Sequence, residues 1–272
     1  LIRPIGVYFY IVAILLILLS LKHIISMRIF KSTVFLAAYI LVLSPVILVN
    51  YINFDHIGVS RLGGLNFLYV NAMSVYEIQG GKSHEESIRI VDQKVQEAGG
   101  DTITGPVEKE RLYFDVGMQI IRDNFFAYLI NHINGSINIY TSLSTYNIAR
   151  VLRVENTLLS EKFFGYPVYS QIGSFLEVKS SMMIITGLFV VIIMIFQYFT
   201  ALAGGYYLFR QKKIIEMTIL LLPVVYFTVV TGVVGNARFK LPITPFLLIF
   251  SAYGIYTTRV WYLNRKKSKK ID

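Results

Sequence analysis

Residues 180–209 decide the fold class of this chain, and they run SSMMIITGLFVVIIMIFQYFTALAGGYYLF. The stretch holds no Asp, Glu, Lys or Arg across 30 positions. About 20 apolar residues in a helix are enough to cross the ~30 Å hydrocarbon core of a bilayer. We therefore interpret the stretch as a transmembrane helix.

Four further runs are free of charge over comparable lengths: Ile5–Leu21, Ser32–Phe54, Met217–Ala237 and Leu241–Thr258. Any one of them also fits a buried helix of a soluble protein, but five together, with a mean hydropathy of +0.58, favour a polytopic membrane protein. The predicted fold class is an all-α membrane protein of about five transmembrane helices, with a largely helical extracytoplasmic cap between the second and third. The expected division is transmembrane helices in 1–54, the cap in 55–179, transmembrane helices in 180–263 and a basic cytoplasmic tail in 264–272.

The distribution of Lys and Arg predicts the orientation of these helices. Twelve of them flank one set of helix ends, namely Lys22, Arg28, Lys31, Arg210, Lys212, Lys213, Arg259, Arg265, Lys266, Lys267, Lys269 and Lys270. Cytoplasmic flanks carry this excess, so the C-terminus is predicted to be cytoplasmic, in what we interpret as a bacterial plasma membrane. The basic balance then reflects contact with anionic lipid, and no basic face interleaved with aromatics indicates a nucleic-acid partner.

The sequence offers no metal or disulfide framework. It has no cysteine, and its four histidines (His23, His56, His84 and His132) are scattered. We therefore expect neither a metal site supplied by this chain alone nor a bound cofactor.

The cap is predicted to be helical. Ser83 and Glu86 form a capping box for a helix that ends at Gly99-Gly100, and a second helix is expected from about Val107 to His132. Asn134-Gly135-Ser136 matches a glycosylation acceptor, but Asn-Gly is also a turn signal, and a turn is the favoured interpretation.

Three cations on the outer side oppose the charge bias: Arg3, Arg238 and Lys240. They either reach toward lipid headgroups or bind a specific phosphate, with which arginine pairs bidentately. Gly63 and Gly64 allow a close backbone approach, and nearby Asn66 and Asn71 can bond hydroxyl groups, although a plain turn explains these four equally well. Ser44-Pro45 is expected to kink the second helix.

Several of these segments, taken together and in this order, resemble motifs of the GT-C superfamily of membrane glycosyltransferases, in the branch of dolichyl-phosphate-mannose–protein mannosyltransferases and aminoarabinose transferases. They are Ile2-Arg3-Pro4, Ser44-Pro45-Val46-Ile47-Leu48-Val49-Asn50-Tyr51, Arg61-Leu62-Gly63-Gly64-Leu65-Asn66 and Arg238-Phe239-Lys240-Leu241-Pro242-Ile243-Thr244-Pro245. Val46, Val49 and Lys240 depart from the usual Trp, Arg and Arg of the family pattern.

The resemblance implies transfer of a sugar from a polyprenyl-phosphate donor to a glycan, lipid or protein acceptor at the outer face of the membrane. Arg238, Lys240 and Arg3 would bind the donor phosphate, and Gly63, Gly64, Asn66 and Asn71 would help form the substrate site. The catalytic acid residues of this family lie in an N-terminal half, so we expect this sequence to be a C-terminal portion of a larger protein and assign no catalytic residue. Glu77, Glu85 and Glu86 are ordinary solvated acids by sequence.

Two other functions remain open at this stage. A transporter or flippase subunit for a lipid-linked or anionic substrate would also use outer cations and kinked helices. Charged residues within the membrane runs, or inverted repeats, would favour this function, and the five runs show neither. A structural cap-and-anchor protein without activity is the third possibility.

Overall fold

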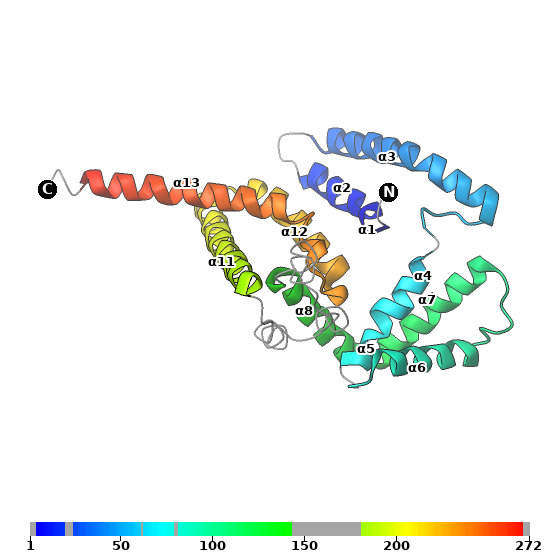
Figure 1. Ribbon diagram of the computed structural model, residues 1–272. Helices are drawn as coiled ribbons and strands as arrows, with labels where there is room; N and C mark the ends of the chain where they lie inside the picture. Colours follow the sequence, from blue (N-terminus) through cyan, green and yellow to red (C-terminus); the bar gives the residue numbers. More distant parts are fainter. Residues whose placement is uncertain (1–3, 20–23, 61, 79–80, 143–180, 269–272) are drawn as a thin grey trace. The chain divides into compact units, whose positions relative to one another are not determined.

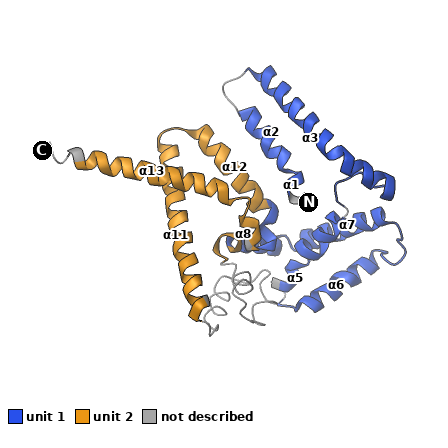
Figure 2. Cartoon of the chain, turned by 45° about the horizontal axis from the view of Figure 1, so that its top comes forward, with its two compact units in different colours: residues 1–137, 230–235 blue, residues 138–229, 236–272 orange. Residues whose placement is uncertain are grey.

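In the computed structural model the chain is helical throughout the part that is described, namely residues 4–19, 24–60, 62–78, 81–142 and 181–268 (Figure 1). No strand occurs in these residues, which confirms the all-α prediction. The helices form two compact units, one of residues 1–137 and 230–235 and the other of residues 138–229 and 236–272 (Figure 2).

Unit 1 begins with an antiparallel pair of apolar helices. Short α1 (Pro4–Val7) and α2 (Phe9–Leu19) lead to the long α3 (Ile25–Phe54), and the hydroxyl of Tyr39 on α3 donates to the Val7 carbonyl. Pro45 lies inside α3, as predicted. The helix ends where Asp55 adopts a left-handed conformation with φ of 51°.

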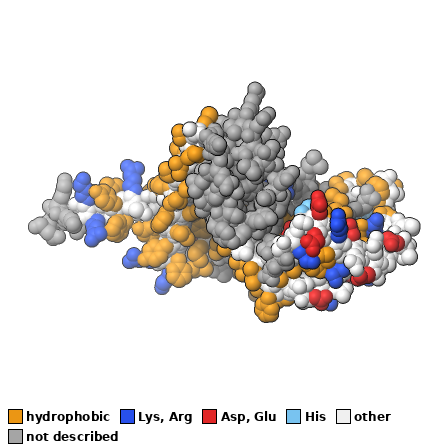
Figure 3. All heavy atoms as spheres, turned by 60° about the horizontal axis from the view of Figure 1, so that its bottom comes forward, with side chains coloured by type: hydrophobic (Ala, Val, Ile, Leu, Met, Phe, Trp, Pro, Cys, Tyr) orange, Lys and Arg blue, Asp and Glu red, His pale blue; other side chains and the backbone are white. Residues whose placement is uncertain are grey.

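The rest of unit 1 is a helical module with its own core. Its elements are α4 (Gly63–Asn66), the π-helix η1 (Phe67–Ala72), α5 (Ser74–Ile78), α6 (His84–Glu97), α7 (Pro106–Asp123) and the first part of α8 (Phe125–Thr141). Leu68, Val91 and Ile120 are fully buried where η1, α6 and α7 meet. Acidic and basic side chains are mixed on the outer surface of α6 and α7, as expected of a face in water (Figure 3).

The predicted start of α6 is confirmed, and two predictions in the following region are wrong. The Ser83 hydroxyl accepts from the Glu86 amide at 3.2 Å, which is half of the predicted capping box. The single helix expected from Val107 to His132 is divided at Asn124, whose side chain donates to the Ile120 carbonyl at 2.9 Å and whose backbone leaves the helical region at φ −130°. The Asn134–Ser136 turn does not exist, because these residues continue α8, where Asn-Gly is held within the helix by packing.

Unit 2 is built on crossed apolar helices. It contains the end of α8, α11 (Ser181–Arg210), most of α12 (Ile214–Thr231), the 3₁₀ helix η4 (Ala237–Lys240) and α13 (Thr244–Ser268), while the 3₁₀ helix η3 (Gly232–Val234) belongs to unit 1. Gly204 on α11 and Gly254 on α13 let the two backbones approach closely, since a Cβ on either would collide with a carbonyl of the other helix. Small residues at a crossing are typical of helices packed in a membrane.

Among the described residues, three helices are long and apolar enough to cross a bilayer, at Ile25–Phe54, Ile184–Arg210 and Ile214–Val234. They correspond to three of the five predicted crossings and support an integral membrane protein. The run at Ile5–Leu21 gives only the 11-residue α2, and the run at Leu241–Thr258 lies mostly in α13. Crossing by these two, the division between cap and bundle, and the cytoplasmic C-terminus stay predictions.

Candidate functional site

The predicted phosphate-binding segment forms a short 3₁₀ turn between two apolar helices of unit 2. The Asn236 side chain caps it by accepting from the Arg238 amide at 3.0 Å. The Lys240 carbonyl then accepts from the Thr244 hydroxyl at 2.9 Å, which joins the turn to the start of α13. Helix α13 begins at Thr244, three residues after the start of the charge-free run at Leu241. Pro242 therefore lies in the turn before the helix.

Arg238 and Lys240 differ in what their side chains contact. The Arg238 side chain is exposed, and its guanidinium carbon lies 5.0 Å from the centre of the Phe239 ring. A guanidinium held against an aromatic face keeps its outward N–H groups for an oxyanion. Arg238 is therefore the cation of this turn that is accessible to a phosphate.

Lys240 is half-buried, and its ammonium binds the protein itself. The Nζ atom donates to the carbonyls of Tyr140 at 3.0 Å and Ser142 at 3.4 Å, and lies 3.8 Å from the sulfur of Met194. Tyr140 is in the last turn of α8, where carbonyls lack intrahelical partners and the helix dipole attracts a cation. Burial lowers the pKa of Lys240 to about 8.

A cavity of about 440 Å³ lies in the same unit and shares Tyr140 with Lys240. Its walls are mainly apolar and aromatic, and they include Tyr140, Tyr198, Leu221, Val224, Leu247 and Phe250. The Tyr198 hydroxyl donates at 2.7 Å to the same Tyr140 carbonyl that binds Lys240, and the Tyr140 hydroxyl pairs with that of Thr228 at 2.5 Å. These bonds leave aromatic faces and aliphatic side chains as the surface offered to a ligand, which suits a hydrocarbon chain.

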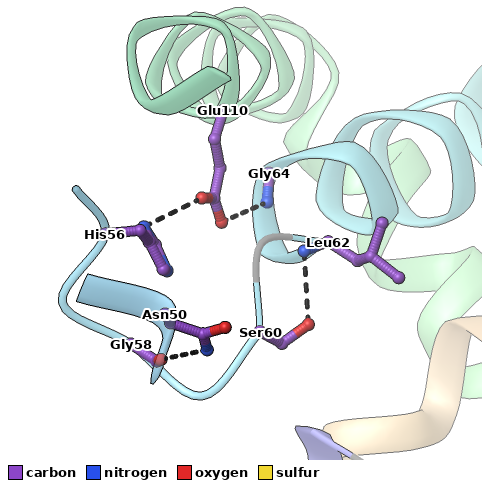
Figure 4. Close-up of polar contacts among 7 residues, drawn as sticks. All are labelled: Asn50, His56, Gly58, Ser60, Leu62, Gly64 and Glu110. Atoms are coloured by element: carbon purple, nitrogen blue, oxygen red, sulfur yellow. Dashed lines mark hydrogen bonds and ion pairs between the residues drawn. The ribbon is translucent and has the colours of Figure 1, made fainter. Parts of the chain in front are cut away.

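The second predicted segment, at Gly63 and Gly64, packs against Glu110 of α7 (Figure 4). The Gly64 amide donates to Glu110 Oε1 at 3.4 Å, and a Cβ on Gly64 would collide with the Glu110 backbone carbonyl. A close backbone approach at Gly64 is therefore observed, and the segment that Gly64 approaches is helix α7 of the same unit.

His56 completes this group from the loop that follows α3. Its Nδ1 lies 3.6 Å from Glu110 Oε2, and the two side chains are 15% and 19% exposed. In the same loop Asn50 donates to the Gly58 carbonyl at 2.7 Å, and the Ser60 hydroxyl accepts from the Leu62 amide at 3.2 Å (Figure 4). A carboxylate, an imidazole and a backbone amide thus meet in one half-buried polar cluster.

Sequence reasoning did not single out Glu110 or His56. Glu110 was given no role by the sequence, and His56 was one of four scattered histidines. They lie on different elements, with no motif that joins them. The one available signal was the Gly63-Gly64 pair, which required some partner at close approach.

The two asparagines of the predicted substrate site are joined by a local hydrogen bond. The Asn71 side chain donates to the Asn66 carbonyl at 3.3 Å across the π-helix η1. The Asn71 carbonyl in turn accepts from the Ser74 hydroxyl at 2.6 Å. A π-helical turn frequently marks a functional position, and this one adjoins Gly63 and Gly64.

The remaining predicted residues are local or lie outside the described structure. Arg3 is outside the described residues, as is Arg61. Glu77 contacts His84, and Glu86 pairs with Lys82 at 3.3 Å on the exposed surface. Within the described ranges, no group of three or more His, Asp or Glu side chains is placed to hold a metal ion.

No protein-family model matches this chain, and neither a curated protein nor a solved structure gives a significant match.

Proposed function

We propose that this chain belongs to an integral membrane glycosyltransferase, similar to the mannosyltransferase and aminoarabinose-transferase branch, that uses a polyprenyl-phosphate-linked sugar as its donor. The observation that carries the proposal is the exposed guanidinium of Arg238 in a capped turn that directly follows a candidate membrane span. A cation there meets the phosphate of a membrane lipid at headgroup depth.

Lys240 supports the same role in an indirect way. An ammonium group has three N–H donors. The neighbours of Lys240 Nζ are two carbonyl oxygens and a thioether sulfur. Lys240 therefore holds the turn on the end of α8, adds positive potential, and leaves direct phosphate binding to Arg238.

The cavity of unit 2 supplies the apolar half of the proposed donor site. Its volume of about 440 Å³ suits a segment of an isoprenoid chain, and Tyr140 belongs both to its wall and to the Lys240 contact. During transfer the acceptor oxygen would bond to the anomeric carbon as the bond to the phosphate oxygen breaks, and the acceptor hydroxyl would pass its proton to a general base, to which we assign no residue of this chain. The leaving phosphate would take that electron pair, and its charge would be stabilised by the nearby cations.

The proposal is tested by photo-crosslinking a diazirine-bearing polyprenyl phosphate to the protein in proteoliposomes. Arg238→Ala is expected to weaken labelling about tenfold or more, since charge-assisted hydrogen bonds contribute about 1.5–3 kcal/mol, whereas Arg238→Lys keeps part of it. Unlabelled polyprenyl phosphate should compete and the neutral polyprenol should not. Equal competition by polyprenol, or full labelling of Arg238→Ala, contradicts a phosphate site.

Transfer and transport are separated in vesicles prepared from the native membrane. The protein in its native membranes should move radiolabelled sugar from polyprenyl phosphate to a hydroxyl acceptor, and Arg238→Ala should lower that rate. Movement of the intact donor between leaflets, without any transferred sugar, would instead identify a flippase.

A further inference from the structure

The first part of α8, residues 125–137, carries an apolar stripe on its exposed side. Phe126 is 78% exposed, Ile130 49%, Ile133 51% and Ile137 47%. These positions follow the i, i+4, i+7, i+11 spacing of a single helix face. The stripe is therefore continuous over three turns and is not a set of isolated surface residues.

The opposite side of the same helix holds the small and polar residues. Ala127, Asn131 and Gly135 are buried, and the Asn131 side chain donates to the Ser74 carbonyl at 2.9 Å. Gly135 lies so close to Gly232 of η3 that a Cβ would collide with its carbonyl. The polarity of α8 is thus the reverse of a surface helix in water, which turns its apolar face inward.

The sequence around α8 is also unlike that of its neighbours. Residues 124–149 contain no Asp, Glu, Lys or Arg across 26 positions, whereas α6 and α7 carry both signs of charge on their outer surface. A helix exposed to water on that scale would be expected to carry charge, as α6 and α7 do. The surroundings of the stripe must therefore be apolar.

The chain itself indicates which apolar surroundings these are. Three helices in the described part of the chain are suited to cross a bilayer, and Gly232, the contact of Gly135, lies within the candidate span Ile214–Val234. Helix α8 thus packs through Gly135 against a segment that is itself expected to be in lipid, and the stripe is on the side of α8 that faces away from this contact. The 17 residues of α8 reach about 25 Å, less than the ~30 Å of the hydrocarbon core, which favours a helix embedded at one interface over a spanning one.

We propose that residues 125–137 of α8 are embedded in the lipid–water interface on the outer face of the membrane, with the stripe Phe126–Ile130–Ile133–Ile137 against lipid acyl chains. This moves α8 from the aqueous cap into the membrane. It rests on no assumption about the donor, so a negative result with polyprenyl phosphate leaves it unaffected.

The absence of cysteine allows a direct test with single-cysteine variants of the full chain. A nitroxide is attached at Phe126→Cys, Ile130→Cys, Ile133→Cys or Ile137→Cys in vesicles of phosphatidylethanolamine and phosphatidylglycerol. Collision with oxygen, which concentrates in acyl chains, is compared with collision with a water-soluble nickel chelate. Arg122→Cys on α7 and Gln93→Cys on α6 are the exposed controls, and a label at either keeps the helix intact.

The four stripe positions should collide several-fold more with oxygen than with nickel, and the two controls should show the opposite preference. Nickel access at the stripe equal to that of the controls overturns the proposal. Protection from both reagents, with dipolar broadening between labels, also overturns it, because a second copy of the chain would then cover the stripe.

Discussion

The ammonium of Lys240 donates at 3.0 Å to the main-chain carbonyl of Tyr140, across 100 positions of sequence. The same carbonyl accepts from the hydroxyl of Tyr198 at 2.7 Å. One backbone oxygen thus joins the end of α8, the turn before α13 and the middle of α11. Because an amide carbonyl has two lone pairs, it satisfies both donors at once.

Lys240 gives the stability of the protein a specific dependence on pH. Burial lowers its pKa from 10.5 to about 8, so the folded state loses this proton at a lower pH than the unfolded state does. Between about pH 8 and 10.5 the unfolded state binds more protons, and the contribution of Lys240 to the free energy of unfolding therefore rises with pH in this window. Below about pH 8 that contribution is constant and unfavourable, because both states are charged.

The measurement compares Lys240→Met with the parent protein by thermal unfolding in detergent from pH 7 to 10.5. The difference in Tm between the two should change across the window, while Lys82→Met, on the exposed surface, should give a difference that stays flat. A flat difference for Lys240→Met contradicts the assignment of this titration to Lys240.

The membrane helices were predictable because their signal is local. Residues 184–209 carry no Asp, Glu, Lys or Arg, as a bilayer demands, whatever the rest of the chain does. The Ser83 cap was predictable for the same reason, since it joins residues three positions apart. Asn124 shows the limit of such local prediction. Its side chain bonds the Ile120 carbonyl and ends a helix whose apolar spacing continues on both sides.

The candidate sites were less predictable because tertiary contacts form them. Gly64 indicated a close approach, but only the fold brings Glu110 to it. Lys240 was expected to face a phosphate, and its carbonyl partners Tyr140 and Ser142 lie beyond His132, where the predicted cap helix ended. Residues so far apart share no periodicity from which their contact could be inferred.

Gly64→Ala is expected to destabilise unit 1. The added methyl group would collide with the Glu110 backbone carbonyl, which cannot rotate away as a side chain can. Overpacking of this kind costs about 1–3 kcal/mol. The effect is measured as a fall in the free energy of unfolding in mixed micelles.

Gly6→Ala is the matched control for this change. A Cβ on Gly6 meets nothing within 4 Å, and Gly6 lies in α1. Replacing a helical glycine by alanine there should leave stability equal or raise it by about 0.5–1 kcal/mol. Equal losses for the two variants would show that general backbone effects, and not the contact with Glu110, explain the result.

Glu110→Gln separates the two contacts of this carboxylate. A glutamine oxygen can still accept from the Gly64 amide, but the charge that faces His56 is lost. In a double-mutant cycle with His56→Gln, the coupling energy should be about 0.2–1 kcal/mol, the range of partly exposed ion pairs. Glu110→Ala should cost more than Glu110→Gln, because it also removes the partner of the Gly64 amide.

The cycle is repeated with Glu108→Gln in place of Glu110→Gln as the charge control, since Glu108 is in the first turn of the same helix. A coupling of zero for Glu110, or an equal coupling for Glu108→Gln, would mean that His56 and Glu110 act independently and that their proximity has no electrostatic consequence.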